Sequence, residues 1–158
     1  MVDVRLNVGL VDQSGVKMTK SGSKEVKNAC WYAAACMVSY YFRPGPRRGI
    51  PKLWQADQGL PEARILELCA AEGLVPLDQP DKITPEWLAA VLTDSGPIWA
   101  AGHFLDEPGH VIVITGIQHS VVHYNDPEVP PARTMLLGTL DSGRWKPDGL
   151  LVKDRSRY

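Results

Sequence analysis

The sequence has only three cysteines among its 158 residues, and no two of them have the CxxC spacing typical of a structural zinc site. They are Cys30, Cys36 and Cys69. An odd number this small argues against a disulfide scaffold and leaves at least one thiol free. We therefore expect no structural zinc site, and synthesis in a reducing cytosol.

The chain also lacks a surplus of charge and any long hydrophobic run. Its 17 basic and 18 acidic residues give a formal net charge of -1, so no basic surface predicts binding to nucleic acid or to an anionic membrane. No segment reaches the roughly 18 apolar residues of a membrane helix. Residues Met1–Gly15 lack the apolar stretch of a signal peptide. We expect a cytoplasmic chain, or one exported by a signal-independent machine into a target cell.

The hydrophobic content of 44% is enough for one compact domain over residues 1–158. Helices are expected over Asn28–Phe42, Pro61–Ala71 and Pro85–Ser95, the last capped by Thr84 and stopped by Gly96. Strands are expected over Leu6–Val11, Ile98–Ala101, His110–Ile117 and Ser120–Asn125. Because helices largely precede strands, the order predicts an α+β fold with an antiparallel sheet.

Cys30 is expected in the first turn of an apolar helix that follows a polar loop. Backbone N–H groups at a helix N-terminus carry partial positive charge, which stabilises a thiolate over a thiol. Cys36 and Cys69 are flanked by apolar residues inside predicted helices, where burial favours the neutral thiol. A free cysteine is often only a small buried hydrophobic residue, so position alone leaves both interpretations of Cys30 open.

His110 follows Gly109 and opens the apolar run Val111–Thr115, which places its ring at the mouth of a core strand. The other histidines, His103, His119 and His123, are expected in loops or on the surface. The hairpin that starts at His110 ends at Asn125 and Asp126, so either of these side chains is expected beside the ring. Such a partner fixes the tautomer of a histidine and stabilises its protonated form, although Asn, Asp and Pro here also suit an ordinary turn.

At these residues the sequence resembles the bacterial papain-like cysteine peptidases, which include type III effector proteases and double-glycine peptidase domains. The resemblance rests on the Cys-Trp helix Asn28–Val38, on Gly109–Gly116 and on Tyr124–Pro127. It implies a papain-like fold in which an N-terminal helical part packs the nucleophile helix on a C-terminal antiparallel sheet. It also implies Cys30 as nucleophile, His110 as base and Asp126 rather than Asn125 as orienter, with no metal ion and no organic cofactor.

The chain departs from the family at the glutamine that usually precedes the nucleophile and donates to the oxyanion. Lys24 occupies the usual place, and the nearest upstream glutamine is Gln13. The segment Leu6–Gln13 resembles the strand that leads to this glutamine, which makes residues 14–27 an inserted loop. Gln13 is therefore the candidate oxyanion donor, with a solvated loop amide as the alternative.

The function expected from the resemblance is hydrolysis of peptide bonds in protein or peptide substrates by a bacterial effector or toxin. An inhibitor or immunity protein fits the same setting as a second partner. A cell-wall amidase or an acyltransferase uses the same Cys-His pair and stays open as an alternative. So does a papain-like binding module without turnover, although the presence of all three of Cys30, His110 and Asp126 argues against it.

Overall fold

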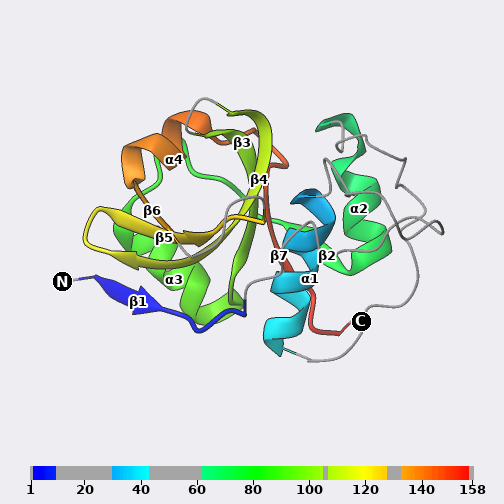
Figure 1. Cartoon of the computed structure of the whole chain (residues 1–158), viewed down its shortest axis with the longest axis horizontal. Helices are drawn as coiled ribbons and strands as arrows, with labels where there is room; N and C mark the ends of the chain where they lie inside the picture. The colour runs from blue at the N-terminus through cyan, green and yellow to red at the C-terminus, as the bar shows by residue number, and fades with distance from the viewer. Residues whose placement is uncertain (1, 10–29, 43–61, 105–106, 128–132, 157–158) are drawn as a thin grey trace, which may run out of the picture.

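The computed structural model describes residues 2–9, 30–42, 62–104, 107–127 and 133–156 (Figure 1). The helices are α1 (Cys30–Phe42), the 3-10 turn η2 (Glu62–Arg64), α2 (Ile65–Glu72), α3 (Pro85–Ser95) and α4 (Leu137–Gly143). The strands are β1 (Asp3–Arg5), β2 (Leu74–Pro76), β3 (Ile98–Phe104), β4 (Glu107–Gln118), β5 (Val121–Asn125), β6 (Arg133–Leu136) and β7 (Leu150–Lys153).

The strands form one sheet in the order β2-β7-β3-β4-β5-β6, and β1 pairs with β4 outside this path. Every pairing between the described strands is antiparallel. The predicted α+β class with an antiparallel sheet is confirmed. Within the described ranges, no helix combines the length and apolar character that crossing a bilayer requires.

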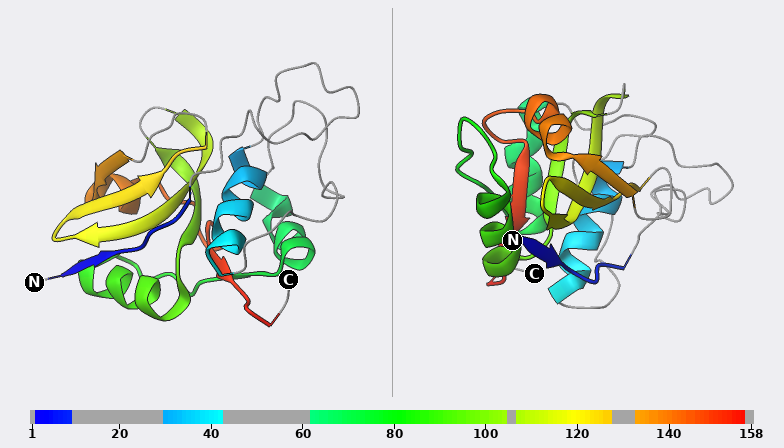
Figure 2. Two further views of the ribbon diagram at one scale, coloured as in Figure 1. Left: turned by 60° about the horizontal axis from the view of Figure 1, so that its bottom comes forward. Right: turned by 90° about the vertical axis from the view of Figure 1, so that its left-hand side faces the viewer.

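The sheet has a hydrophobic cluster on each face because its central strands are apolar on both sides. On one face, α1 and α2 pack against Trp99, Val111 and Val113. On the other face, α3 and α4 pack against residues that alternate with these, such as Ile112 and Ile114. Figures 1 and 2 show α1 and α2 together on one side of β4, with α3 and α4 on the other. Cys30, the candidate nucleophile, therefore lies on the face of the sheet that α1 and α2 cover.

Helix α1 is apolar around its whole circumference, and each residue from Cys30 to Ser39 is buried. A helix of this composition belongs in a core rather than on a surface. Helix α3 begins and ends where its signals predict: the Thr84 hydroxyl accepts a hydrogen bond from the Trp87 N–H, and Gly96 follows at φ 83°. Helix α2 likewise ends before Gly73, at φ 66°.

The strand predicted over Leu6–Val11 is wrong in its position. The observed ladder covers Asp3–Arg5 and is extended by one hydrogen bond, from the Leu6 N–H to the Thr115 carbonyl. Beyond that bond the segment leaves β4, because Leu6 packs on the α3 face whereas Val8 packs on the α1 face. The apolar character of the segment therefore indicated packing against the sheet and helices correctly, but not pairing with β4. Residues 10 and 11 lie outside the described ranges.

Candidate active site

Helix α1 places Cys30 against the sheet. Cys30 is the first residue of α1 that the structure describes, and its side chain is buried. The indole Nε1 of Trp99, on β3, donates a hydrogen bond of 2.9 Å to the backbone carbonyl of Trp31. Trp31 and Trp99 are both buried. The sheet therefore holds the turn that carries the thiol through a specific polar contact as well as through packing.

His110 lies near the start of β4, where it pairs with Gly102 of β3. The preceding residue, Gly109, has φ 66°, a left-handed conformation that only glycine adopts without strain. The His110 side chain is 8% exposed. A titratable ring so enclosed needs polar partners, because an unpaired buried polar group is costly.

Asp126 is one of those partners. Its Oδ1 lies 2.8 Å from Nε2 of His110, and its side chain is also 8% exposed. Asp126 directly follows β5, whose last residue, Asn125, pairs with Val113. Since Nε2 is engaged by the carboxylate, Nδ1 is the ring nitrogen available to a second partner.

Asn125 is directed elsewhere. Its amide Nδ2 donates to the Val8 carbonyl at 3.1 Å and lies 3.7 Å from the sulfur of Met37 in α1. The two candidates for orienting the ring therefore have different surroundings. Asp126 contacts His110, whereas Asn125 joins the N-terminal segment to α1.

Cys30 is the second partner of the imidazole. Burial lowers the pKa of His110, but hydrogen bonds with Asp126 and Cys30, and the negative charges on both, outweigh burial and raise this pKa from 6.5 to about 10. The imidazole is therefore held in its protonated form at neutral pH, between Asp126 and Cys30.

The other candidate residues are not part of this group. His103 contacts Trp145, and His119 lies in the β4–β5 turn. The pKa of His123 is lowered by burial and by the charge of Arg5. Cys36 and Cys69 are buried within α1 and α2. Gln13 lies outside the described residues. The described residues also contain no group of three or more His, Cys, Asp or Glu side chains that would suit a metal ion.

A family model described as the papain-like cysteine protease AvrRpt2 matches residues 11–142. This range is most of the chain and includes Cys30, His110 and Asp126. The chain belongs to this family. It is therefore a papain-like cysteine peptidase and a hydrolase, and the resemblance inferred from the motifs is confirmed. The order in which α1, β4 and β5 follow one another agrees with the Cys, His, Asp order of papain-like peptidases.

Sequence reasoning missed the contact from Trp99 to α1. In the sequence, Trp99 resembles any other apolar residue of a core strand. Nothing in its neighbours indicates that its indole N–H has a polar partner. The available signal is general: a buried tryptophan usually directs its N–H to a polar partner.

Proposed function

We propose that the chain hydrolyses peptide bonds of protein substrates with Cys30 as nucleophile, His110 as general acid and base, and Asp126 as the residue that orients His110. The observation that carries this proposal is the position of the His110 ring between two acidic partners. Its Nε2 is 2.8 Å from Asp126, and its raised pKa depends on both Asp126 and Cys30.

The first half of the reaction forms an acyl-enzyme. The His110 Nδ1 holds the proton of the Cys30 thiol, and the resulting thiolate attacks the carbonyl carbon of the scissile peptide bond. In the tetrahedral intermediate the carbonyl oxygen bears the negative charge. When the intermediate collapses, the C–N bond breaks and the imidazolium gives its proton to the leaving amine. A thioester on Cys30 remains, and His110 is neutral.

The second half reverses these roles. Neutral His110 takes a proton from a water molecule, whose oxygen attacks the thioester carbonyl. Collapse of the second intermediate breaks the C–S bond, releases the carboxylic acid product and restores the thiolate-imidazolium pair. Asp126 holds the ring and balances its positive charge in both halves of the reaction.

Gln13 is proposed as the donor that stabilises the oxyanion in both intermediates. This assignment is supported by the sequence of the segment Leu6–Gln13, and Gln13 itself lies outside the described residues. Removing one such donor lowers kcat by roughly 100-fold to 1000-fold. A Gln13→Ala variant is therefore expected to keep Cys30 reactive toward small alkylating agents while losing most of its turnover.

The biological setting is proposed from the family. The matching model is that of a type III effector protease, and we propose that this chain is likewise delivered by a signal-independent machine and cleaves proteins of the receiving cell.

The experiment that tests the activity compares new protein termini in cells that express the wild type or Cys30→Ala. Cys36→Ala is the matched control, because Cys36 lies in the same helix but inside the core. We expect termini that appear with the wild type and with Cys36→Ala and are absent with Cys30→Ala. If no terminus depends on Cys30, peptide hydrolysis is the wrong assignment.

A further inference from the structure

Phe42, the last residue of α1 that the structure describes, has its ring held far from Cys30 along the helix. The tip of the ring lies on Gly96, the residue that follows α3. A Cβ built on Gly96 would overlap Cζ of Phe42 and lie 3.1 and 3.3 Å from its two Cε atoms. Gly96 also has φ 83°. It therefore meets two requirements at once, a left-handed backbone and room for the ring.

An arginine covers the face of the same ring. Cζ of Arg155, in the segment that follows β7, lies 5.2 Å from the centroid of the Phe42 ring. At this distance a guanidinium and an aromatic ring attract each other. Nη2 of Arg155 also donates a hydrogen bond of 3.3 Å to the carbonyl of Asp94, in the last turn of α3. We call Gly96, Arg155 and the Asp94 carbonyl the Phe42 socket.

The segment that carries Arg155 is itself fixed by hydrogen bonds. The Asp154 N–H donates to the carbonyl of Gly73, the residue that follows α2, at 2.8 Å. Oδ1 of Asp154 accepts from the backbone N–H and the hydroxyl of Ser156 at 3.0 and 2.6 Å. Figures 1 and 2 show this segment beside α1. The Phe42 socket is therefore attached to the ends of α2 and α3.

Helix α1 connects the Phe42 socket to the nucleophile as one hydrogen-bonded element. Close to Cys30, the Trp31 carbonyl is held by the Trp99 indole. Phe42 lies about 16 Å further along the axis, at a rise of 1.5 Å per residue. Between them, the alanines at positions 33–35 are fully buried, but short side chains interlock little with their neighbours. The contacts at both places therefore add to what fixes α1 along its axis.

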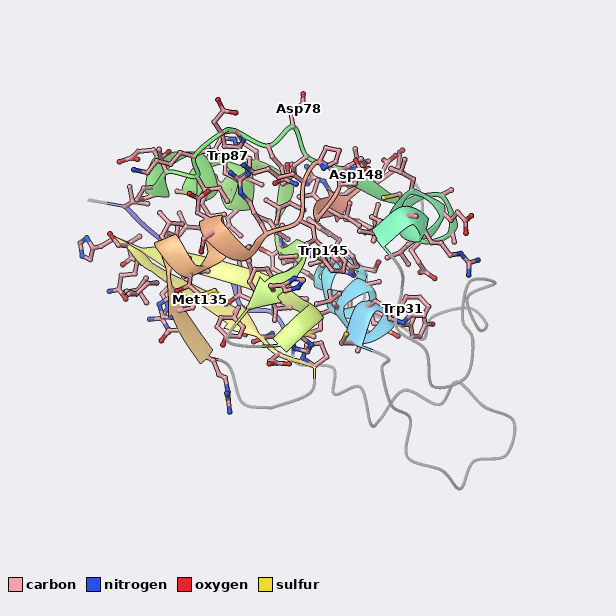
Figure 3. All side chains as sticks on the ribbon, turned by 90° about the horizontal axis from the view of Figure 1, so that it is seen from above. Trp31, Asp78, Trp87, Met135, Trp145 and Asp148 are labelled. Carbon is pink, nitrogen blue, oxygen red and sulfur yellow. The ribbon has the colours of Figure 1, made fainter. Side chains whose placement is uncertain are left out.

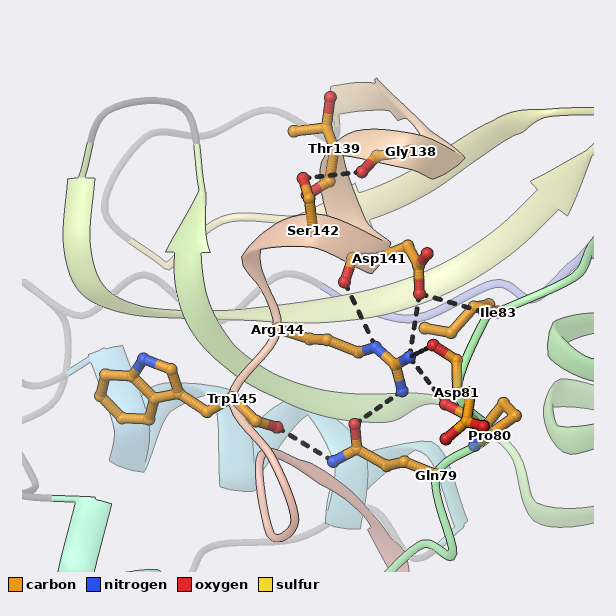
Figure 4. Close-up of polar contacts among 10 residues, drawn as sticks. All are labelled: Gln79, Pro80, Asp81, Ile83, Gly138, Thr139, Asp141, Ser142, Arg144 and Trp145. Carbon is orange, nitrogen blue, oxygen red and sulfur yellow. Dashed lines mark hydrogen bonds and ion pairs between the residues drawn. The ribbon is translucent and has the colours of Figure 1, made fainter.

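A buried polar network holds the other side of the active site (Figure 4). The side chain of Arg144 is fully buried. Its guanidinium donates to Oε1 of Gln79 at 2.9 Å and to the carbonyls of Pro80 and Asp81 at 2.7 and 3.0 Å. Gln79 in turn donates to the carbonyl of Trp145 at 3.0 Å. Because the planar fork of arginine binds several acceptors at once, this network joins the segment before α3 to the residues after α4.

The two reacting side chains therefore depend on different kinds of contact. Gly102 pairs with His110 in the sheet and forms a β-bridge with Arg144, so the backbone of the base is attached to the buried network. Helix α1, which carries Cys30, is held instead by a socket whose arginine is exposed. Exposed contacts open at a lower free energy than buried networks. The position of Cys30 is therefore the one that a surface contact can change.

We infer that Phe42 is a positioning residue, which holds α1 so that the Cys30 sulfur stays at the distance from the His110 ring that the reaction requires. The inference rests on the proposed function. A misplacement of about 1 Å between reacting groups can lower the rate on the order of 100-fold. Because Phe42 is far along α1 from the thiol, its loss should affect the chemical step, and therefore kcat, more than KM.

The test measures two properties of Cys30 in each variant. The first is the rate of alkylation by iodoacetamide at neutral pH. The second is kcat and KM for a peptide whose Cys30-dependent cleavage by the wild type is first identified in a digested proteome. Phe42→Leu removes the ring and keeps an apolar side chain. Arg155→Gln removes the cation, Arg155→Lys restores it, and the double variant Phe42→Leu/Arg155→Gln tests whether the two residues act together.

Met135→Ala is the matched control for a general loss of stability. Met135 is buried in β6 and belongs to the hydrophobic cluster on the other face of the sheet. Figure 3 shows it well away from Trp31 on α1. Its truncation creates a cavity that lowers stability without touching α1 or the Phe42 socket. Circular dichroism establishes a temperature at which every variant compared is folded.

We expect Phe42→Leu to lower kcat by about 10-fold or more, with KM within about 2-fold of the wild-type value, and to slow alkylation of Cys30. Arg155→Gln should cause a smaller loss of the same kind, and Arg155→Lys should recover most of it. The double variant should lose no more than Phe42→Leu alone, because Arg155 acts through the ring. Folded Met135→Ala should keep the wild-type kcat and alkylation rate.

A wild-type kcat and alkylation rate in Phe42→Leu, or equal losses in Met135→Ala, would overturn the inference alone. If Phe42→Leu does not fold, the Arg155 variants decide, and a wild-type kcat in Arg155→Gln would overturn it. No Cys30-dependent cleavage by the wild type would overturn the proposed function. The alkylation rates would still show whether Phe42 sets the position of Cys30.

Discussion

Trp99 and Trp31 are joined by a hydrogen bond of 2.9 Å from the indole of the first to the backbone carbonyl of the second. The bond links β3, which pairs with the His110 end of β4, to the helical turn that contains Cys30. Cys30 and His110, the two residues proposed to exchange a proton, come from different parts of the chain. This contact therefore helps to fix the distance between them, and its removal is a test of how closely that distance matters.

The Trp99→Phe variant keeps an aromatic ring in the core but removes the donor. We expect a loss of about 1 kcal/mol in the free energy of unfolding, the usual net value of one hydrogen bond. We also expect a drop in kcat with little change in KM, because misplacement affects the reacting groups more than substrate binding. Chemical denaturation and steady-state kinetics measure the two effects. Trp87→Phe, on α3, is the control, and equal losses of kcat in both variants would count against a positioning role for Trp99.

Asp126→Asn tests the electrostatic part of the site. The carboxylate helps to raise the pKa of His110 to about 10, so the imidazolium persists through neutral pH and is lost as pH rises through that value. Asparagine is neutral, so it stabilises the protonated ring of His110 less strongly than aspartate does. We therefore expect the basic limb of the kcat/KM profile to move to lower pH in Asp126→Asn.

Asn125→Ala is the matched control for Asp126→Asn. The Asn125 amide contacts Val8 and Met37, so its loss should reduce stability by about 1 kcal/mol and leave the basic limb in place. If the basic limb moves in Asn125→Ala and stays fixed in Asp126→Asn, the two residues have been assigned the wrong roles.

Gly109→Ala tests the backbone that precedes His110. An added Cβ meets only ordinary contacts with Trp145, at 3.6 Å, so the cost comes from φ 66°, and about 1 to 2 kcal/mol of stability should be lost. Gly138→Ala is the opposite case, because this glycine lies in α4 with open space around its Cβ position. The substitution should stabilise the protein by roughly 0.5 to 1 kcal/mol. Thermal unfolding compares the two, and destabilisation of similar size would contradict the conformational argument.

Local signals in the sequence predicted the elements whose ends they define. Thr84, Pro85 and Gly96 mark α3 at the observed residues, and Cys30 lies in a helix as expected. Strand β7, in contrast, lies between β2 and β3 but consists of only four residues without alternation. Strands buried on both faces show little alternation of polar and apolar residues, so a short run of this kind carries little information about its structure.

The polar network around Arg144 was beyond the reach of sequence reasoning for a different reason. Its partners Gln79, Pro80 and Asp81 are more than 60 residues away along the chain, and an arginine, a glutamine and two carbonyls have no characteristic spacing. The contact between His110 and Asp126 could be predicted because the hairpin between them is a local structure with predictable geometry. It missed the network that holds Trp145 because tertiary packing alone brings those groups together.

The measurement that tests the central claim most directly is the rate at which iodoacetamide alkylates each of the three cysteines near neutral pH, followed by mass spectrometry in wild type and in His110→Ala. Cys36 and Cys69 are buried within α1 and α2 and serve as internal controls. A thiolate paired with the imidazolium of His110 predicts that Cys30 reacts at least about 10-fold faster than either control and that this advantage falls sharply in His110→Ala. Equal rates for the three cysteines, or a Cys30 rate that does not depend on His110, would contradict the account.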